Sequence, residues 1–277
     1  MEHLTLLVKP ASSLCDLRCR YCFYEDVSDS RQVKNMGRMT EETARRLLTA
    51  SVQAVGAQGS MQIIFQGGEP TLAGLEFYRS FLALEGQICP SSLRITHSIQ
   101  TNGMTLDREW ADFLGEHGFL VGLSLDGARE FHDTLRVDPR GKGTWDRAVR
   151  ALALLDGAGV ETNLLCVVTN QLSRSPQKVY QSLKKLGNHP LQFIPCLDPL
   201  DAPRGGMPYS LPPARYGKFL CGLFDAWYRD LEAGRYVSIR LFDDYLRILA
   251  GMPPSTCAAA GACGSYLVVE GDGSLYP

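Results

Sequence analysis

Short β-rich runs alternate with amphipathic helical patterns over most of the chain, and this alternation constrains the fold more than any other feature. Strands are predicted at 4–8, 61–65, 93–99, 119–125, 161–168 and 191–195. Helices are predicted at 40–55, from about 75, and at 107–117, 144–156, 175–187 and 216–231. Alternating strands and helices form parallel sheets with right-handed crossovers. We therefore predict an α/β fold. No Gly-x-Gly-x-x-Gly follows a predicted strand, which argues against a dinucleotide-binding sheet.

Unusually polar segments follow four of the predicted strands, at 66–70, 100–103, 124–127 and 196–199. Each segment alone is compatible with a simple turn, because Gly, Asn and Asp favour turns. In barrels, however, functional groups collect just after the carboxyl ends of the strands. Together the four segments predict one shared site.

Charge and hydropathy exclude several classes of partner. The chain has 28 Lys and Arg against 30 Asp and Glu, a net charge of −2, so nothing electrostatic favours nucleic acid. No apolar run reaches the roughly 18 residues that predict a membrane span, and the run at 4–8 is too short for a signal peptide. We therefore expect a cytoplasmic protein whose nine cysteines are mostly reduced, and such cysteines are more often metal-binding or catalytic than disulfide-bonded.

Three cysteines, Cys15, Cys19 and Cys22, fall within one short segment after the first predicted strand. Iron–sulfur cubes normally take four thiolates, so three would leave one iron open, as at a catalytic metal site. A zinc site is the main alternative, but it would need a fourth ligand, and His3 is the only histidine nearby. Three unliganded core cysteines are the remaining alternative.

The cysteine segment resembles a known superfamily. Cys-x3-Cys-x2-Cys, with Tyr21 before the last cysteine and Phe23 and Tyr24 after it, is similar to the radical S-adenosylmethionine enzymes. The segment Gln-Gly-Gly-Glu-Pro-Thr-Leu at 66–72 resembles their glycine-rich motif.

Further motifs narrow the resemblance to the anaerobic sulfatase-maturating enzymes. They are Gln-Thr-Asn-Gly at 100–103, Ser-Leu-Asp-Gly at 124–127, His-Asp at 132–133 followed by Arg136, and Cys-Leu-Asp-Pro at 196–199. The resemblance runs from about residue 4 to the end of the chain. It implies a partial six-stranded (β/α) barrel over residues 1–234. A linker and the beginning of a cysteine-rich SPASM domain would follow over 235–277.

The resemblance also implies the cofactors and their contacts. Cys15, Cys19 and Cys22 would hold a 4Fe-4S cluster, whose open iron chelates the methionine amino and carboxylate groups of S-adenosylmethionine. Chemistry favours these contacts, because glycine permits close backbone approach and arginine binds carboxylates with a planar fork. Tyr24 would lie on the substrate side. The residues expected to contact S-adenosylmethionine are Tyr21, Gly67, Gly68, Glu69, Gln100, Ser124, Arg136 and Leu197.

The activity implied is oxidation of a peptide. In the family, the reduced cluster cleaves S-adenosylmethionine, and a 5′-deoxyadenosyl radical removes a Cβ hydrogen from a Cys or Ser of a sulfatase. A second electron and a proton then leave, and hydrolysis yields Cα-formylglycine. The implied partners are a sulfatase or another peptide substrate, and an electron donor such as ferredoxin or flavodoxin. The sequence does not distinguish a Cys target from a Ser target.

Two late cysteines match the start of the family's auxiliary-cluster domain. Cys257 and Cys263 correspond to its first two ligands, although a free pair in a loop is an alternative. The remaining ligands of the auxiliary 4Fe-4S clusters, and the acidic residue proposed as the family's base, are expected beyond Pro277. Two thiolates do not complete a cube, so we expect a C-terminally truncated chain.

Other functions remain open at this point. One is a different SPASM-type enzyme that forms thioether or carbon–carbon crosslinks in a ribosomal peptide. Another is a non-enzymatic iron–sulfur electron carrier, although a carrier has no need of an exchangeable iron position. A zinc-stabilised binding module is the third.

Overall fold

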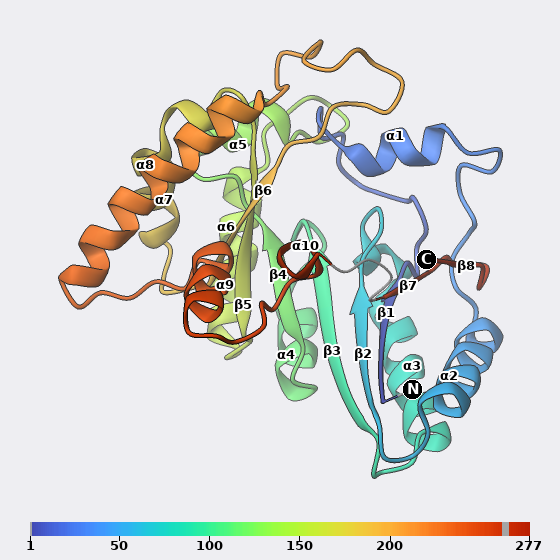
Figure 1. Ribbon diagram of the computed structural model, residues 1–277. Helices are drawn as coiled ribbons and strands as arrows, with labels where there is room; N and C mark the ends of the chain where they lie inside the picture. Colours follow the sequence, from blue (N-terminus) through green and yellow to red (C-terminus); the bar gives the residue numbers. More distant parts are fainter. Residues whose placement is uncertain (1, 262–265) are drawn as a thin grey trace.

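The computed structural model describes residues 2–261 and 266–277, with the backbone alone at 257 and 258. Its centre is a single sheet in the order β6-β5-β4-β3-β2-β1-β7-β8 (Figure 1). The strands are β1 (His3–Val8), β2 (Ser60–Phe65), β3 (Arg94–Thr101), β4 (Leu120–Ser124), β5 (Thr162–Val168), β6 (Leu191–Pro195), β7 (Leu267–Val269) and β8 (Leu275–Tyr276). Strands β1 to β6 are neighbours in chain order and pair in parallel, as the sequence predicts.

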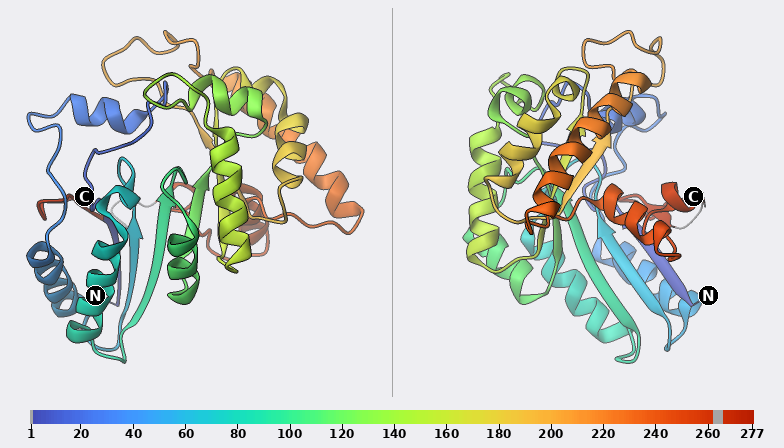
Figure 2. Two further views of the ribbon diagram at one scale, coloured as in Figure 1. Left: turned by 180° about the vertical axis from the view of Figure 1, so that it is seen from behind. Right: turned by 60° about the vertical axis from the view of Figure 1, so that its left-hand side comes forward.

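Most helices cover one face of this curved sheet, while α9 and α10 lie on the other side (Figure 2). The helices are α1 (Phe23–Asp29), α2 (Glu41–Val55), α3 (Leu75–Ile88), α4 (Arg108–Glu116), α5 (Arg129–Leu135), α6 (Trp145–Gly157), α7 (Pro176–Lys184), α8 (Pro213–Glu232), α9 (Arg240–Leu249) and α10 (Cys257–Ala260). Short 3-10 turns occur at Pro70–Ala73 and Leu172–Arg174. None of these described helices combines the length and apolar character needed to cross a membrane.

Local sequence signals set the beginning of two outer helices. The Thr43 backbone N–H donates to the Thr40 hydroxyl at 3.1 Å, which caps α2 where the sequence predicts its start. The Trp110 N–H donates to the Asp107 carboxylate at 3.0 Å and caps α4 in the same way. The buried apolar side chains of both helices belong to one hydrophobic core with the alternating buried residues of β1 and β2.

The segment 266–276 forms a hairpin, with β7 and β8 antiparallel. The hairpin also joins the main sheet, because β7 pairs in parallel with β1 from Leu6–Leu267 to Val8–Val269. Upstream, Ile239 makes an isolated parallel bridge with Leu191 of β6. The stretch after α8 therefore touches both edges of the six-stranded unit. A domain boundary near residue 234 stays a prediction.

Candidate active site

The carboxyl ends of β1 to β6 surround a cavity of about 380 Å³. All four polar segments predicted to share a site contribute to its wall. A larger hollow of about 890 Å³ lies between α3 and α4, but it contains none of the predicted site residues and none of the residues at these strand ends. The cavity brings together twelve of the predicted site residues, namely Cys15, Cys19, Tyr21, Cys22, Tyr24, Gly67, Gly68, Glu69, Gln100, Ser124, Arg136 and Leu197.

The cysteine triplet lies on the loop between β1 and α1, and its three thiols are free. Backbone pairing with the chain after α5 fixes this loop, because the Arg18 and Arg20 N–H groups donate to the carbonyls of Val137 and Leu135 at 2.8 and 2.9 Å. All three cysteines line the cavity. The loop therefore presents three thiols to one enclosed space.

The environment of these thiols suits ligands of a cluster. Burial raises the pKa of Cys15 to about 12 and that of Cys19 to about 11, so a thiolate at either position needs a nearby cation. Among the described residues, no three His, Cys, Asp or Glu side chains converge on a single metal ion. In a 4Fe-4S cube each thiolate binds a different iron. Three thiols that line one cavity fit such a cube with one iron left open.

The glycine-rich loop after β2 packs directly on the cysteine loop. The Gly68 N–H donates to the Ser12 carbonyl at 2.9 Å. A Cβ atom at Gly68 would lie 2.2 Å from the Leu14 carbonyl oxygen, a distance that no side chain tolerates. We expected Gly68 to permit close approach of the cofactor, and the structure adds a second reason for glycine, since the backbone of the cysteine loop occupies that space.

Glu69 joins the end of β2 to the end of β3. Its Oε2 accepts the Asn102 N–H at 2.8 Å, and its Oε1 accepts the Thr71 and Thr101 hydroxyls at 2.6 and 2.7 Å. Burial raises the pKa of Glu69, while these hydrogen bonds oppose that shift. Asn102 in turn donates to Asp16 at 2.8 Å, next to Cys15. The carboxylate thus sets the shape of the cavity wall through its neighbours.

Sequence reasoning missed Asp126, a buried carboxylate after β4. Arg136 Nε donates to its Oδ2 at 2.9 Å, and the Val167 N–H donates to its Oδ1 at 2.8 Å. The Tyr21 hydroxyl donates to Oδ2 as well, and the Arg136 guanidinium lies 5.4 Å from the Tyr21 ring centre. Asp126 stands in the polar segment 124–127, which was the available signal. It joins two predicted cofactor contacts that are distant in sequence.

A neutral His132 supports the Asp126–Arg136 pair through hydrogen bonds. The Asp126 N–H donates to its Nδ1 at 3.2 Å, so Nδ1 must be unprotonated. The Thr144 hydroxyl donates to the Arg136 carbonyl at 2.9 Å and is left to accept from His132 Nε2 at 3.1 Å. Burial lowers the pKa of His132 from 6.5 to about 4. The neutral ring therefore orders the segment that carries Asp126 and Arg136.

The remaining predicted residues differ in their surroundings. Tyr24 is buried, and its hydroxyl has no hydrogen-bond partner within the described parts of the chain. Leu197, expected to pack on adenine, is 59 % exposed at the rim after β6. Cys257 begins α10, whereas Cys263 lies outside the described residues.

Comparison with known proteins decides the family. The model of the Radical SAM superfamily matches residues 10–183, which include the cysteine triplet. A cysteine-type anaerobic sulfatase-maturating enzyme of Clostridium novyi (strain NT) is 44 % identical over 277 residues, which are 100 % of this chain and 74 % of that protein. The chain belongs to the anaerobic sulfatase-maturating enzymes of the radical SAM superfamily.

Two further similarities extend this assignment. A serine-type anaerobic sulfatase-maturating enzyme of Klebsiella aerogenes is 37 % identical over 272 residues, 98 % of this chain and 65 % of that protein. The solved structure described as native anSMEcpe with bound AdoMet and Cp18Cys peptide is 45 % identical, with a TM-score of 0.91 over 99 % of this chain and 73 % of that one. The match confirms the predicted α/β fold with a partial barrel.

As an anaerobic sulfatase-maturating enzyme, the protein is a radical S-adenosylmethionine oxidoreductase. Enzymes of this family use a 4Fe-4S cluster and S-adenosylmethionine to convert a Cys or Ser of a sulfatase to Cα-formylglycine. The cavity at the strand ends contains the cysteines and the polar groups that such chemistry requires.

Proposed function

We propose that this enzyme is of the cysteine type and oxidises a peptidyl cysteine within a sulfatase. The greater identity to the cysteine-type than to the serine-type relative supports this choice. A solved relative with a bound peptide supports a peptide as the substrate. The observation that carries the proposal is that twelve of the predicted site residues, from several strand ends of the partial barrel, line one cavity.

Within that cavity, we assign the cluster to Cys15, Cys19 and Cys22. When bound, the cluster and S-adenosylmethionine supply a 5′-deoxyadenosyl radical that abstracts hydrogen. Arg136 binds the carboxylate of S-adenosylmethionine, because its planar guanidinium lines the cavity and is oriented there by its hydrogen bond to Asp126. Ser124, at the end of β4, offers a hydroxyl to the same cofactor.

The other predicted contacts have shape-setting or apolar roles in this proposal. Gly67 and Gly68 keep the backbone close to the methionine end of S-adenosylmethionine, and Glu69 holds their loop in place. Gln100 offers an amide to the cofactor, and Leu197 covers its adenine from the rim. Tyr21 is held by Asp126 beside Arg136.

Tyr24 faces the substrate in this proposal. Its hydroxyl is buried without a partner in the described chain, and a buried hydroxyl favours a hydrogen bond. Its ring lines the cavity, where a bound peptide would contact it.

The route of the second electron and the donor of the first electron are also proposed. Cys257 and Cys263 are assigned to auxiliary 4Fe-4S clusters of the full-length protein, and ferredoxin or flavodoxin to the supply of the first electron. A cytoplasmic location is proposed with them, because reduced thiols are needed to assemble the clusters.

One anaerobic experiment tests the proposed function. The full-length natural protein is reconstituted with iron and sulfide, then given reductant, S-adenosylmethionine and a peptide containing Cys-x-Pro-x-Arg. We expect 5′-deoxyadenosine and a peptide whose cysteine has become an aldehyde. The matched peptide with serine at that position should react more slowly.

Two results would contradict the proposal. If the serine peptide reacts faster, the cysteine-type assignment is wrong. If 5′-deoxyadenosine forms while both peptides keep their mass, the substrate lies among other ribosomal peptides.

A further inference from the structure

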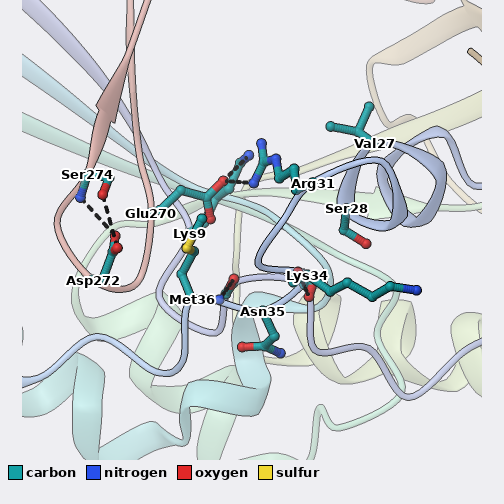
Figure 3. Close-up of polar contacts among 12 residues, drawn as sticks. Lys9, Val27, Ser28, Arg31, Lys34, Asn35, Met36, Glu270, Asp272 and Ser274 are labelled. Carbon is teal, nitrogen blue, oxygen red and sulfur yellow. Dashed lines mark hydrogen bonds and ion pairs between the residues drawn. The ribbon is translucent and has the colours of Figure 1, made fainter.

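Glu270, directly after β7, forms a buried ion-pair group with Lys9 and Arg31 (Figure 3). Its Oε1 accepts from Lys9 Nζ at 2.8 Å and from Arg31 Nη1 at 2.6 Å, and the Glu270 side chain is 0 % exposed. Its Oε2 has no partner among the residues that the structure describes. One carboxylate thus holds two cations that would otherwise repel each other in a poorly solvated place.

The three members come from three segments of the chain. Lys9 follows β1, Arg31 follows α1, and Glu270 follows β7. These segments pack closely, because the backbone N–H of Lys9 donates to the Val269 carbonyl at 2.8 Å. A Cβ atom at Gly271 would lie only 2.2 Å from the Gly37 carbonyl oxygen. The ion pairs therefore fasten the β7 end to the segments on both sides of the cysteine loop.

Lys9 connects the Glu270 ion-pair group to the cavity wall. The Lys9 ammonium lies 4.4 Å from the centre of the Tyr24 ring, within the range of a cation–π contact. The stem of Lys9 packs beside Gly67, since a Cβ atom there would meet Lys9 Cβ at 3.3 Å. Tyr24 itself lines the cavity. An ammonium held against the face of the Tyr24 ring restrains the orientation of that ring.

We propose that Glu270 is a positioning residue for peptide oxidation. By holding Lys9 and Arg31, it keeps Tyr24 in place at the cavity wall against which the peptide binds. This inference rests on the substrate-side role proposed above for Tyr24. Glu270 touches neither the cysteine triplet nor the Asp126–Arg136 pair through any contact described here, so its loss should spare cleavage of S-adenosylmethionine itself.

The test uses Glu270→Gln in the full-length reconstituted enzyme. Glutamine keeps the shape but leaves Lys9 and Arg31 without a counter-charge. We expect 5′-deoxyadenosine formation without peptide to stay near the wild-type rate. With peptide, formylglycine formed per 5′-deoxyadenosine should fall about tenfold, because small misplacements of reacting groups carry such costs. The matched control is Asp272→Asn, two residues further on, whose exposed carboxylate only orders the turn at Ser274.

A double variant separates positioning from general damage. If Glu270 acts through Tyr24, Glu270→Gln should lower the yield of formylglycine no further in a Tyr24→Ala background. Additive losses would overturn the inference, as would a wild-type yield in Glu270→Gln. If that variant fails to fold, Arg31→Gln replaces it, because Arg31 is partly exposed and the Lys9–Glu270 contact stays. A smaller loss of the same kind is then expected, and a wild-type yield would count against Glu270.

A readout independent of turnover keeps this inference separate from the proposed function. With 3-fluorotyrosine at position 24, Glu270→Gln should shift or broaden the fluorine resonance, whereas Asp272→Asn should not. An unchanged resonance overturns the positioning role. A shifted resonance in an enzyme that leaves cysteine peptides unmodified overturns the substrate assignment alone.

Discussion

Arg136 Nε donates to the Asp126 carboxylate at 2.9 Å, and both side chains are buried, with Arg136 lining the cavity that contains the cysteine triplet. The pair joins the chain after β4 to the end of α5. Because the Tyr21 hydroxyl donates to the same carboxylate, Asp126 orients one residue of the cysteine loop and one cation of the cofactor site together. Cluster and S-adenosylmethionine binding should therefore depend on a side chain that contacts neither.

Asp126→Asn should weaken S-adenosylmethionine binding about tenfold. The new amide cannot accept from Arg136, Tyr21 and the Val167 N–H together, and it turns a donor toward one of them. Breaking a buried ion pair should also lower the free energy of unfolding by about 3 kcal/mol. The binding curve is measured from the EPR spectrum of the reduced cluster. The control is Asp112→Asn, which removes only an ion pair with Arg108 within α4, and equal affinities in both variants would contradict the prediction.

Gly68→Ala should prevent stable assembly of the cluster. The added Cβ would lie 2.2 Å from the Leu14 carbonyl oxygen, so the cysteine loop must move. Overpacking of this kind costs about 1–3 kcal/mol. We expect reduced iron and sulfide content after reconstitution. Gly86→Ala in α3, where nothing lies within 4 Å of the new atom, should retain full iron content. A wild-type iron content in Gly68→Ala would contradict the prediction, because the cysteine loop would then accommodate the added Cβ atom.

Acid should destabilise the enzyme through His132. Its folded-state pKa is about 4 and its ordinary value 6.5, so the unfolded chain binds more protons between these values. The contribution is present above about pH 6.5 and is lost as the pH falls toward 4. The full effect is about 3 kcal/mol by the usual conversion of pKa shifts. His132→Asn, whose Oδ1 can still accept the Asp126 N–H, should flatten this part of the pH profile. Denaturant unfolding at several pH values measures it, and parallel profiles would refute the assignment.

Cys19→Ser should abolish cluster binding and cleavage of S-adenosylmethionine. A hydroxyl does not supply the thiolate that iron requires. Cys221→Ser is the matched control, because Cys221 is a free, exposed cysteine on α8. Iron and sulfide analysis with 5′-deoxyadenosine assay distinguishes them. Full iron content in Cys19→Ser would remove Cys19 from the ligand set.

Much of this architecture could be predicted from sequence, because its signals are local. Periodicity predicts β1 to β6, and Thr40 predicts the start of α2. The polar segments after the strands predict the shared cavity, since parallel strands place their carboxyl ends together.

The missed features are those that need three dimensions. Lys9 and Glu270 are 261 residues apart, and nothing local marks them as partners. The role of Asp126 depends on the fold of α5, which brings Arg136 back to the end of β4. Helix α1 is only seven residues long and has no side-chain cap, so it carries no clear sequence signal. A strand as short as β7 likewise does not indicate which edge strand it will join.

The pairing of β7 with β1 also bears on the open edges of the sheet. An open half-barrel presents two unpaired strand edges, each a template for association with another chain. Here the β1 edge is extended by β7 and ends in β8, a strand of two residues, while Ile239 touches the β6 edge. The stretch after α8 thus occupies backbone positions at both edges that another chain could otherwise pair with.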